Sequence, residues 1–188
     1  MVTLPITTER LSLRLFTEDD FDDLQALFSD PEVVRYLIWD VLDVDGVWQR
    51  LVDRLARTSL EHEGDVLSLV IEDRSTGAFA GEVIIQYVSG QNAHAEIGYC
   101  VAPWAAGRGF ATEASTALLH LAFGELGLHR VTAGLDECNV ASARVLEKLG
   151  MRREALHVDS HFVKGEWTSE LVYAVLADEF AGVADTAV

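Results

Sequence analysis

Apolar residues recur along this chain at two spacings, and each spacing predicts one kind of element. Near the start, Leu11, Leu13 and Leu15 alternate with Ser12 and Arg14, which predicts a strand with one buried face. Similar patterns between turn residues predict further strands at residues 66–70, 79–87, 96–102, 129–135, 152–163 and 169–176.

Apolar residues three or four positions apart predict helices between these strands. Residues 17–20 place a hydroxyl before three acids, as at a helix start, and Pro31 suits the first position of a second helix. Gly150 suits the position just after a helix end. The amphipathic segments expected to be helical are residues 24–28, 45–60, 114–126 and 140–149.

A glycine-rich turn separates one expected strand from a long helix. Residues 106–114 read AGRGFATEA, directly after the strand at 96–102. Gly107 and Gly109 allow close approach of the backbone to a ligand, and the first turn of a helix has N–H groups without partners inside the helix. Such a turn favours phosphate through backbone donors and the helix dipole, with local help from Arg108. We therefore expect a phosphorylated cofactor here.

Two nucleotide motifs compete for this turn, and each lacks a needed residue. A dinucleotide fingerprint requires a third glycine where Thr112 stands, although Asp136 occupies a plausible acidic position after the next strand. A Walker loop requires Gly-Lys followed by Ser or Thr, and this chain has Gly109-Phe110 in place of Gly-Lys. The pyrophosphate of coenzyme A is the third candidate.

The composition limits the class of protein. The chain has 188 residues, 31 acidic and 14 basic, with a formal net charge of −17. This length fits a single domain at 1–188, with a core near 8–180 and a mobile tail at 181–188. The charge argues against nucleic acid, mildly favours a cationic or neutral substrate, and opposes an anionic cofactor outside a local backbone site.

No membrane span is expected, because the apolar runs are far shorter than the roughly 20 residues that a span requires. The first residues lack a signal-peptide pattern, so we expect a cytoplasmic protein. Cys100 and Cys138 are expected to be small buried residues rather than a disulfide framework. The six histidines show no ligand spacing, so no metal is expected.

Several segments occur in an order typical of one enzyme family. They are residues 8–14 (TERLSLR), 29–37 (SDPEVVRYL), 96–99 (EIGY), 139–142 (NVAS), 147–151 (EKLGM), 165–167 (GEW) and 172–176 (VYAVL). Together with the glycine turn, this set resembles the GNAT-fold N-acetyltransferases, in particular the RimJ/RimL-like branch of ribosomal-protein-alanine acetyltransferase type. The resemblance implies an α+β fold with a mixed, mostly antiparallel central sheet flanked by helices, and acetyl-CoA as cofactor.

The resemblance also implies which residues hold the cofactor. A backbone N–H at the end of the preceding strand polarises the thioester carbonyl, and Asn139 contacts the pantetheine arm. Dimer formation is an expectation that rests on the resemblance alone. By resemblance, the strand end is Cys100, Val101 and Ala102, and the pyrophosphate turn is Gly107, Arg108, Gly109, Phe110, Ala111 and Thr112.

Transfer to an amine also requires a proton acceptor and a proton donor. Glu96, on the strand that leads to the turn, is the first candidate base, and His94 has the same parity; an ion pair or a solvated position is the alternative for Glu96. By resemblance Ser142 lies near the thiolate, although it also suits a helix cap. The tyrosine that many relatives use as acid has no counterpart between Tyr99 and Tyr173, which favours Ser142 or water.

The loop before residue 45 lies where the family has its substrate-facing loop. Trp39 and Asp40 there are candidate substrate-binding residues for an amine, with an ordinary acidic loop as the alternative. Glu113 is expected to support the helix dipole rather than catalysis. Ser169 replaces an acid that relatives often carry after the GEW segment, so no role is assigned to it.

The leading hypothesis is an acetyl-CoA-dependent N-acyltransferase in which a primary amine attacks the thioester directly in a ternary complex. The amine is a protein N-terminus or a small molecule, and another acyl group such as succinyl stays open. The alternatives are a catalytically silent CoA-binding or regulatory module and a nucleotide-dependent oxidoreductase, against which Thr112 and the order of the strands both argue.

Overall fold

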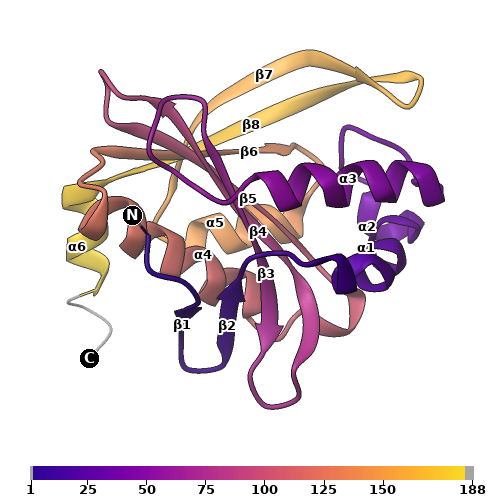
Figure 1. The fold of residues 1–188 in the computed structure, drawn as a ribbon. Coiled ribbons are helices and arrows are strands. Elements are labelled where there is room, and N and C mark those ends of the chain that lie inside the picture. Colours follow the sequence, from indigo (N-terminus) through magenta and orange to yellow (C-terminus); the bar gives the residue numbers. More distant parts are fainter. Residues whose placement is uncertain (1, 185–188) are drawn as a thin grey trace.

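The computed structural model describes residues 2–184, and for 181–184 only the backbone. Within this range eight strands form a single sheet in the order β1-β2-β3-β4-β5-β6-β8-β7 (Figure 1). The strands are β1 (Ile6–Thr7), β2 (Leu11–Arg14), β3 (Val66–Asp73), β4 (Ala78–Ser89), β5 (His94–Val101), β6 (Arg130–Asp136), β7 (Arg152–Val163) and β8 (Glu166–Leu176).

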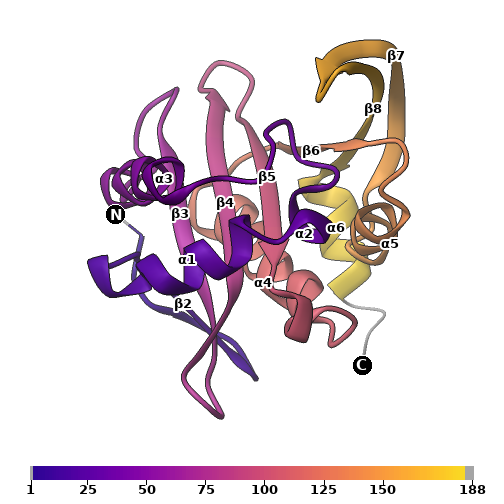
Figure 2. The same cartoon turned by 90° about the vertical axis from the view of Figure 1, so that its right-hand side faces the viewer.

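Helices cover both faces of the central strands. Helices α1 to α3 lie on one face and α4 and α5 on the other (Figures 1 and 2). The helices are α1 (Phe21–Phe28), α2 (Pro31–Val34), α3 (Val44–Ala56), α4 (Phe110–His120), α5 (Val140–Lys148) and α6 (Ala177–Ala184), with a π-helical turn (Leu121–Glu125) extending α4. This arrangement confirms the predicted α+β class.

The sheet is mostly antiparallel because β3, β4 and β5 are joined by short turns. Most central residues of β3 and β4 are apolar and almost fully buried, as strands covered on both faces require. In the described part of the sheet β5 and β6 are the one parallel pair, and they pair over three positions, from His94–Arg130 to Glu96–Thr132. The sheet is therefore open between these two strands beyond Glu96.

Most expected elements occur near their expected bounds, with three corrections. Helix α3 ends at Ala56, so Leu60 is buried beyond it rather than on it. Strand β8 begins at Glu166, three residues earlier than expected, because it forms a long hairpin with β7 that projects beyond the sheet in Figure 1. Strand β1 was not predicted.

The expected tail at residues 181–188 overlaps the end of a further helix. Residues 181–184 belong to α6, which follows β8 without a break, and 185–188 lie outside the described residues. Among residues 2–184, no helix combines the length and the apolar character needed to cross a membrane.

Candidate active site

A narrow cavity of about 190 Å³ occupies the opening between β5 and β6. Beyond Glu96, β5 stays paired with β4 up to Val101, while β6 stays paired with β8 up to Asp136. The two strands therefore diverge, and the backbone groups that face the opening have no strand partner. The cavity walls include Gly98 and Tyr99 of β5, Ser142 of α5, and Asn139, which directly precedes α5.

The hydrogen-bond alternation of β5 identifies which backbone groups face this opening. The Ala102 N–H donates to the Ala80 carbonyl at 2.9 Å, so Ala102 faces β4. Residues of an antiparallel strand alternate between facing and avoiding their partner. Cys100 therefore also faces β4, and Tyr99 and Val101 face the opening. Cys100, Val101 and Ala102 were the three residues expected to offer a backbone N–H to a ligand. Among them, only the N–H of Val101 is directed into the opening between β5 and β6.

The glycine turn has the geometry of an anion site. Gly107 and Gly109 adopt positive φ angles of 74° and 80°, in the left-handed region that glycine tolerates. A Cβ at Gly107 would meet no atom within 4 Å, so its outer side is open. The Glu113 N–H donates to the Gly109 carbonyl at 3.0 Å, which begins the hydrogen bonding of α4. The N–H groups of Phe110, Ala111 and Thr112 precede this bond and remain as first-turn donors.

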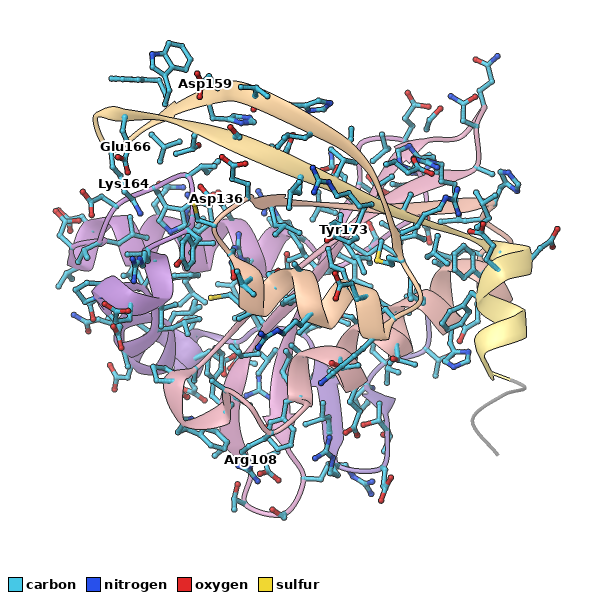
Figure 3. The ribbon with its side chains drawn as sticks, turned by 180° about the vertical axis from the view of Figure 1, so that it is seen from behind. Arg108, Asp136, Asp159, Lys164, Glu166 and Tyr173 are labelled. Atoms are coloured by element: carbon cyan, nitrogen blue, oxygen red, sulfur yellow. The ribbon has the colours of Figure 1, made fainter. Side chains whose placement is uncertain are left out.

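The side chain of Arg108 packs against neighbouring residues of the protein. Its guanidinium lies 4.4 Å from the centre of the Phe110 ring and 5.2 Å from that of Trp104. Arg108 Nη2 also lies 3.3 Å from Asp73 Oδ2. Figure 3 shows Arg108 at the end of the molecule opposite Asp136 and the hairpin tip. The turn therefore offers backbone donors, while the Arg108 charge is partly neutralised by Asp73.

Glu113 anchors the start of α4. Its carboxylate accepts hydrogen bonds from Thr8 Oγ1 at 2.6 Å and from the Arg10 backbone N–H at 2.9 Å. Arg10 Nε also donates to it at 2.6 Å. These contacts lower the pKa of Glu113 against the effect of its partial burial. This arrangement agrees with a structural role near the helix N-terminus.

Helix α5 begins with a side-chain cap that fixes two candidate residues. Asn139 Oδ1 accepts the Ser142 N–H at 3.1 Å, as an N-cap residue does. Its side-chain NH₂ group remains as a donor at the cavity wall. Ser142 Oγ lies 2.8 Å from the hydroxyl of Tyr99, which also donates to the Ser142 carbonyl at 3.0 Å.

Tyr99 is therefore a site residue that the sequence did not reveal. It lies on β5 and reaches α5, 43 positions later in the chain. Burial raises the pKa of its hydroxyl to about 12, so it remains protonated near neutral pH. Its place in the EIGY segment gave no indication of the contact with Ser142. The alternation of a strand predicts on which face of the sheet a side chain lies, but not which residue of another element it meets.

A wider cavity of about 580 Å³ adjoins the narrow one and is lined by Glu96 and Glu170. The two cavities share six lining residues, which are Tyr36, Leu37, Trp39, Gly134, Leu135 and Asp136. Asp136, Lys164 and Glu166, labelled in Figure 3, also line this wider cavity where the hairpin tip approaches β6.

Glu96 stands where β5 and β6 stop pairing. Its side chain keeps exposed surface, but the surrounding walls remove part of its hydration, and this desolvation raises the pKa of its carboxyl. Repulsion from Glu170 adds to the increase. A carboxylate with a raised pKa at the mouth of a cavity is suited to accept a proton.

The remaining candidate residues, His94, Asp40 and Ser169, each make a hydrogen bond to a nearby group of the protein. His94 Nε2 lies 2.8 Å from Thr132 Oγ1, outside both cavities, and burial lowers its pKa. Asp40 also lies outside both cavities; it is exposed and accepts the Val41 N–H at 2.8 Å. Trp39 lines both cavities and Asp40 lines neither, so a substrate-binding role of Asp40 stays a prediction. Ser169 is buried in the wider cavity wall and accepts the Asp159 N–H at 3.2 Å.

A buried ion pair forms one wall of the narrow cavity. Arg54 of α3 and Glu82 of β4 make two parallel hydrogen bonds of 2.7 Å, with side chains 3% and 6% exposed. The sequence did not predict this pair. Cys100 lies opposite Glu82 on β5, and burial raises the pKa of its thiol to about 12. Cys138, in contrast, is exposed, so the expectation that it is buried was wrong.

A family model described as "Acetyltransferase (GNAT) domain" matches residues 10–152. The chain belongs to the GNAT acetyltransferase family. It is 31% identical over 176 residues to the N-acetyltransferase p20 of Bacillus licheniformis, covering 93% of this chain and 97% of p20. A GNAT acetyltransferase structure from Bacillus anthracis is 28% identical with a TM-score of 0.83, covering 93% of this chain and 99% of that chain.

The RimJ/RimL-like resemblance is also confirmed. The structure of Mycobacterium smegmatis RimJ in complex with CoA-disulfide is 26% identical to this GNAT protein, with a TM-score of 0.81 and coverage of 98% and 95% of the two chains. The protein is therefore an acetyltransferase that uses acetyl-CoA. The open β5–β6 edge and the donors of the glycine turn fit such a ligand, because they offer free backbone groups and an anion site on one side of the sheet.

Proposed function

We propose that this acetyltransferase transfers the acetyl group to a primary amine by direct attack, with Glu96 as the base. The observation that carries the proposal is the continuity of the two cavities. Glu96 lines the wider one, Asn139 and Ser142 line the narrow one, and Tyr36 and Trp39 line both. An amine entering through the wider cavity thus passes Glu96 before it reaches the opening between β5 and β6.

Each residue has a role that follows from its position. Bound acetyl-CoA supplies a thioester carbonyl as the acceptor and a thiolate as the leaving group. Glu96 accepts a proton from the incoming ammonium, because an amine must be neutral to attack. The Val101 N–H faces the opening and is the donor proposed for the carbonyl oxygen. The Ser142 hydroxyl would donate a hydrogen bond to the departing thiolate in the narrow cavity, and the second proton that the attacking nitrogen loses would neutralise this sulfur.

The acceptor amine is proposed to be a protein N-terminus or a small molecule. The similarity to the RimJ structure supports the first class, while the acidic chain, with its net charge of −17, favours a cationic or neutral acceptor of either class. Fold similarity alone does not select a substrate, since relatives with one fold act on different molecules. A panel of amines is therefore the first experiment.

Release of free thiol from acetyl-CoA is measured with N-terminal peptides and small amines, for the wild type and for Glu96→Gln. We expect Glu96→Gln to lower kcat/KM by ~10²–10⁴-fold, the usual contribution of a general base. Glu147→Gln, an exposed substitution on α5, is the matched control and should keep full activity. Thermal stabilisation by acetyl-CoA should be equal in all three proteins.

Two outcomes would contradict the proposal in different ways. Full activity of Glu96→Gln would remove Glu96 from the mechanism while leaving the enzyme class intact. Stabilisation by acetyl-CoA without thiol release for any amine, including peptides, would instead favour the silent CoA-binding module. Faster release from succinyl-CoA than from acetyl-CoA would correct the acyl group.

A further inference from the structure

The contact between Tyr99 and Ser142 joins the two sides of the narrow cavity. Tyr99 comes from β5 and Ser142 from the first turn of α5, and both line the cavity. The two hydroxyl oxygens are 2.8 Å apart. Ser142 is further fixed through its backbone N–H, which donates to Asn139 Oδ1 at 3.1 Å. The position of the Ser142 hydroxyl is thus defined from two directions.

The Tyr99–Ser142 contact can be arranged in two ways, because each hydroxyl has a single proton to donate. The hydroxyls of Tyr99 and Ser142 can also each accept more than one hydrogen bond. If Tyr99 donates to Ser142 Oγ, the Ser142 proton is free to point into the cavity. If Tyr99 donates instead to the Ser142 carbonyl at 3.0 Å, Ser142 donates back to Tyr99 and offers nothing to a ligand. Burial keeps the Tyr99 hydroxyl protonated, so it can act as a donor in either arrangement.

We propose that Tyr99 is a positioning residue, which donates to Ser142 Oγ and thereby directs the Ser142 proton toward the sulfur of bound CoA. A donor held at a thiolate stabilises its negative charge, and charge-assisted hydrogen bonds are stronger than neutral ones. The inference rests on the proposed placement of Ser142 beside the sulfur. It does not depend on the identity of the amine.

The direct measurement is the pKa of the CoA thiol in the complex. CoA alone is bound to the protein, and thiolate absorbance in the ultraviolet is followed as the pH is raised, with the protein lacking CoA as the blank. In the wild type we expect a thiol pKa below that of free CoA. Tyr99→Phe should raise it by about one unit, a tenfold loss of thiolate at a given pH. Tyr87→Phe, which removes a phenolic hydroxyl from β4, is the matched control and should leave it unchanged.

A double-substitution cycle then tests whether Tyr99 acts through Ser142. Ser142→Ala should raise the thiol pKa at least as far as Tyr99→Phe, and the double variant should match Ser142→Ala alone. Equal and additive effects of the two changes would overturn the proposal, because Tyr99 would then act independently. No effect of Tyr99→Phe would overturn it as well.

Folding of the variants is checked by thermal melting and by the affinity for CoA. If Tyr99→Phe proves unstable, Ser142→Thr provides the second test, because it retains a hydroxyl: a thiol pKa close to the wild type supports the proposal, and one matching Ser142→Ala refutes it. Since the titration contains no amine, a failure of the proposed transfer reaction would leave this result intact, and the two failures are distinguishable.

Discussion

Replacing Glu82 with glutamine should destabilise the protein strongly, because it removes one charge from a buried ion pair. Arg54 and Glu82 are 3% and 6% exposed and share two hydrogen bonds of 2.7 Å. Within the described residues, Arg54 Nη1 is also buried without a partner, so Glu82 alone balances this guanidinium. The variant would leave a buried charge without its counter-charge.

The expected loss follows from this burial. Removing one partner of a buried pair costs about 3–5 kcal/mol, since the remaining charge stays out of water. For a chain of this size, 1 kcal/mol shifts Tm by roughly 2–4 °C, so Tm should fall by roughly 6–20 °C. The free energy of unfolding of a typical domain is ~5–15 kcal/mol, so the loss is a large part of the total.

Urea denaturation and thermal melting at neutral pH measure this loss. The matched control is Glu32→Gln, whose exposed pair with Arg35 spans 3.8 Å and should contribute less than about 1 kcal/mol. The double variant Arg54→Met with Glu82→Leu should recover most of the loss, because buried pairs are often replaced by apolar residues without penalty. A Tm for Glu82→Gln within about 2 °C of that of Glu32→Gln would refute the reasoning and show that water reaches the pair.

Three further predictions concern the cavities and the glycines. Gly81→Ala should cost about 1–3 kcal/mol in chemical denaturation, because a Cβ there would lie 2.2 Å from the Cys100 carbonyl oxygen; an unchanged midpoint would contradict this. Glu170→Gln should lower the raised pKa of Glu96 and shift the acidic limb of the rate profile to lower pH, since the base acts deprotonated; a shift to higher pH would refute it. Gly109→Ala, at a φ of 80°, should cost roughly 1–2 kcal/mol and weaken acetyl-CoA binding in calorimetry, and unaltered affinity would exclude this turn.

Local signals in the sequence were sufficient for the elements that we propose to bind the cofactor. The glycine turn could be predicted because Gly107 and Gly109 follow an apolar strand and precede a helix, and each of these features is local. Asn139 was expected only through the family resemblance, and the structure shows it as a helix cap, whose side chain accepts the N–H three residues later. Motifs of this kind determine backbone direction within a few residues, which is what an anion site requires.

Contacts between distant segments were not predictable in the same way. Tyr99 meets Ser142 across 43 positions, and Arg54 meets Glu82 across 28. Periodicity assigns each of these residues to a face of its own element, but not to a partner on another. For Asp40, the acidic side chain in the expected substrate-facing loop suggested a contact with the amine. In the structure its carboxylate accepts a hydrogen bond from the Val41 backbone N–H.

The opening between β5 and β6 results from the pairing preferences of the sheet rather than from an unstable strand. After Glu96, each position of β5 keeps its antiparallel partner in β4, and after Thr132 each position of β6 keeps its partner in β8. Neither strand loses its pairing on that side, so the divergence leaves unpaired groups only along the inner edges. A ligand that lies between these edges can satisfy the same backbone groups as a strand, so the paired sheet keeps donors and acceptors available for it.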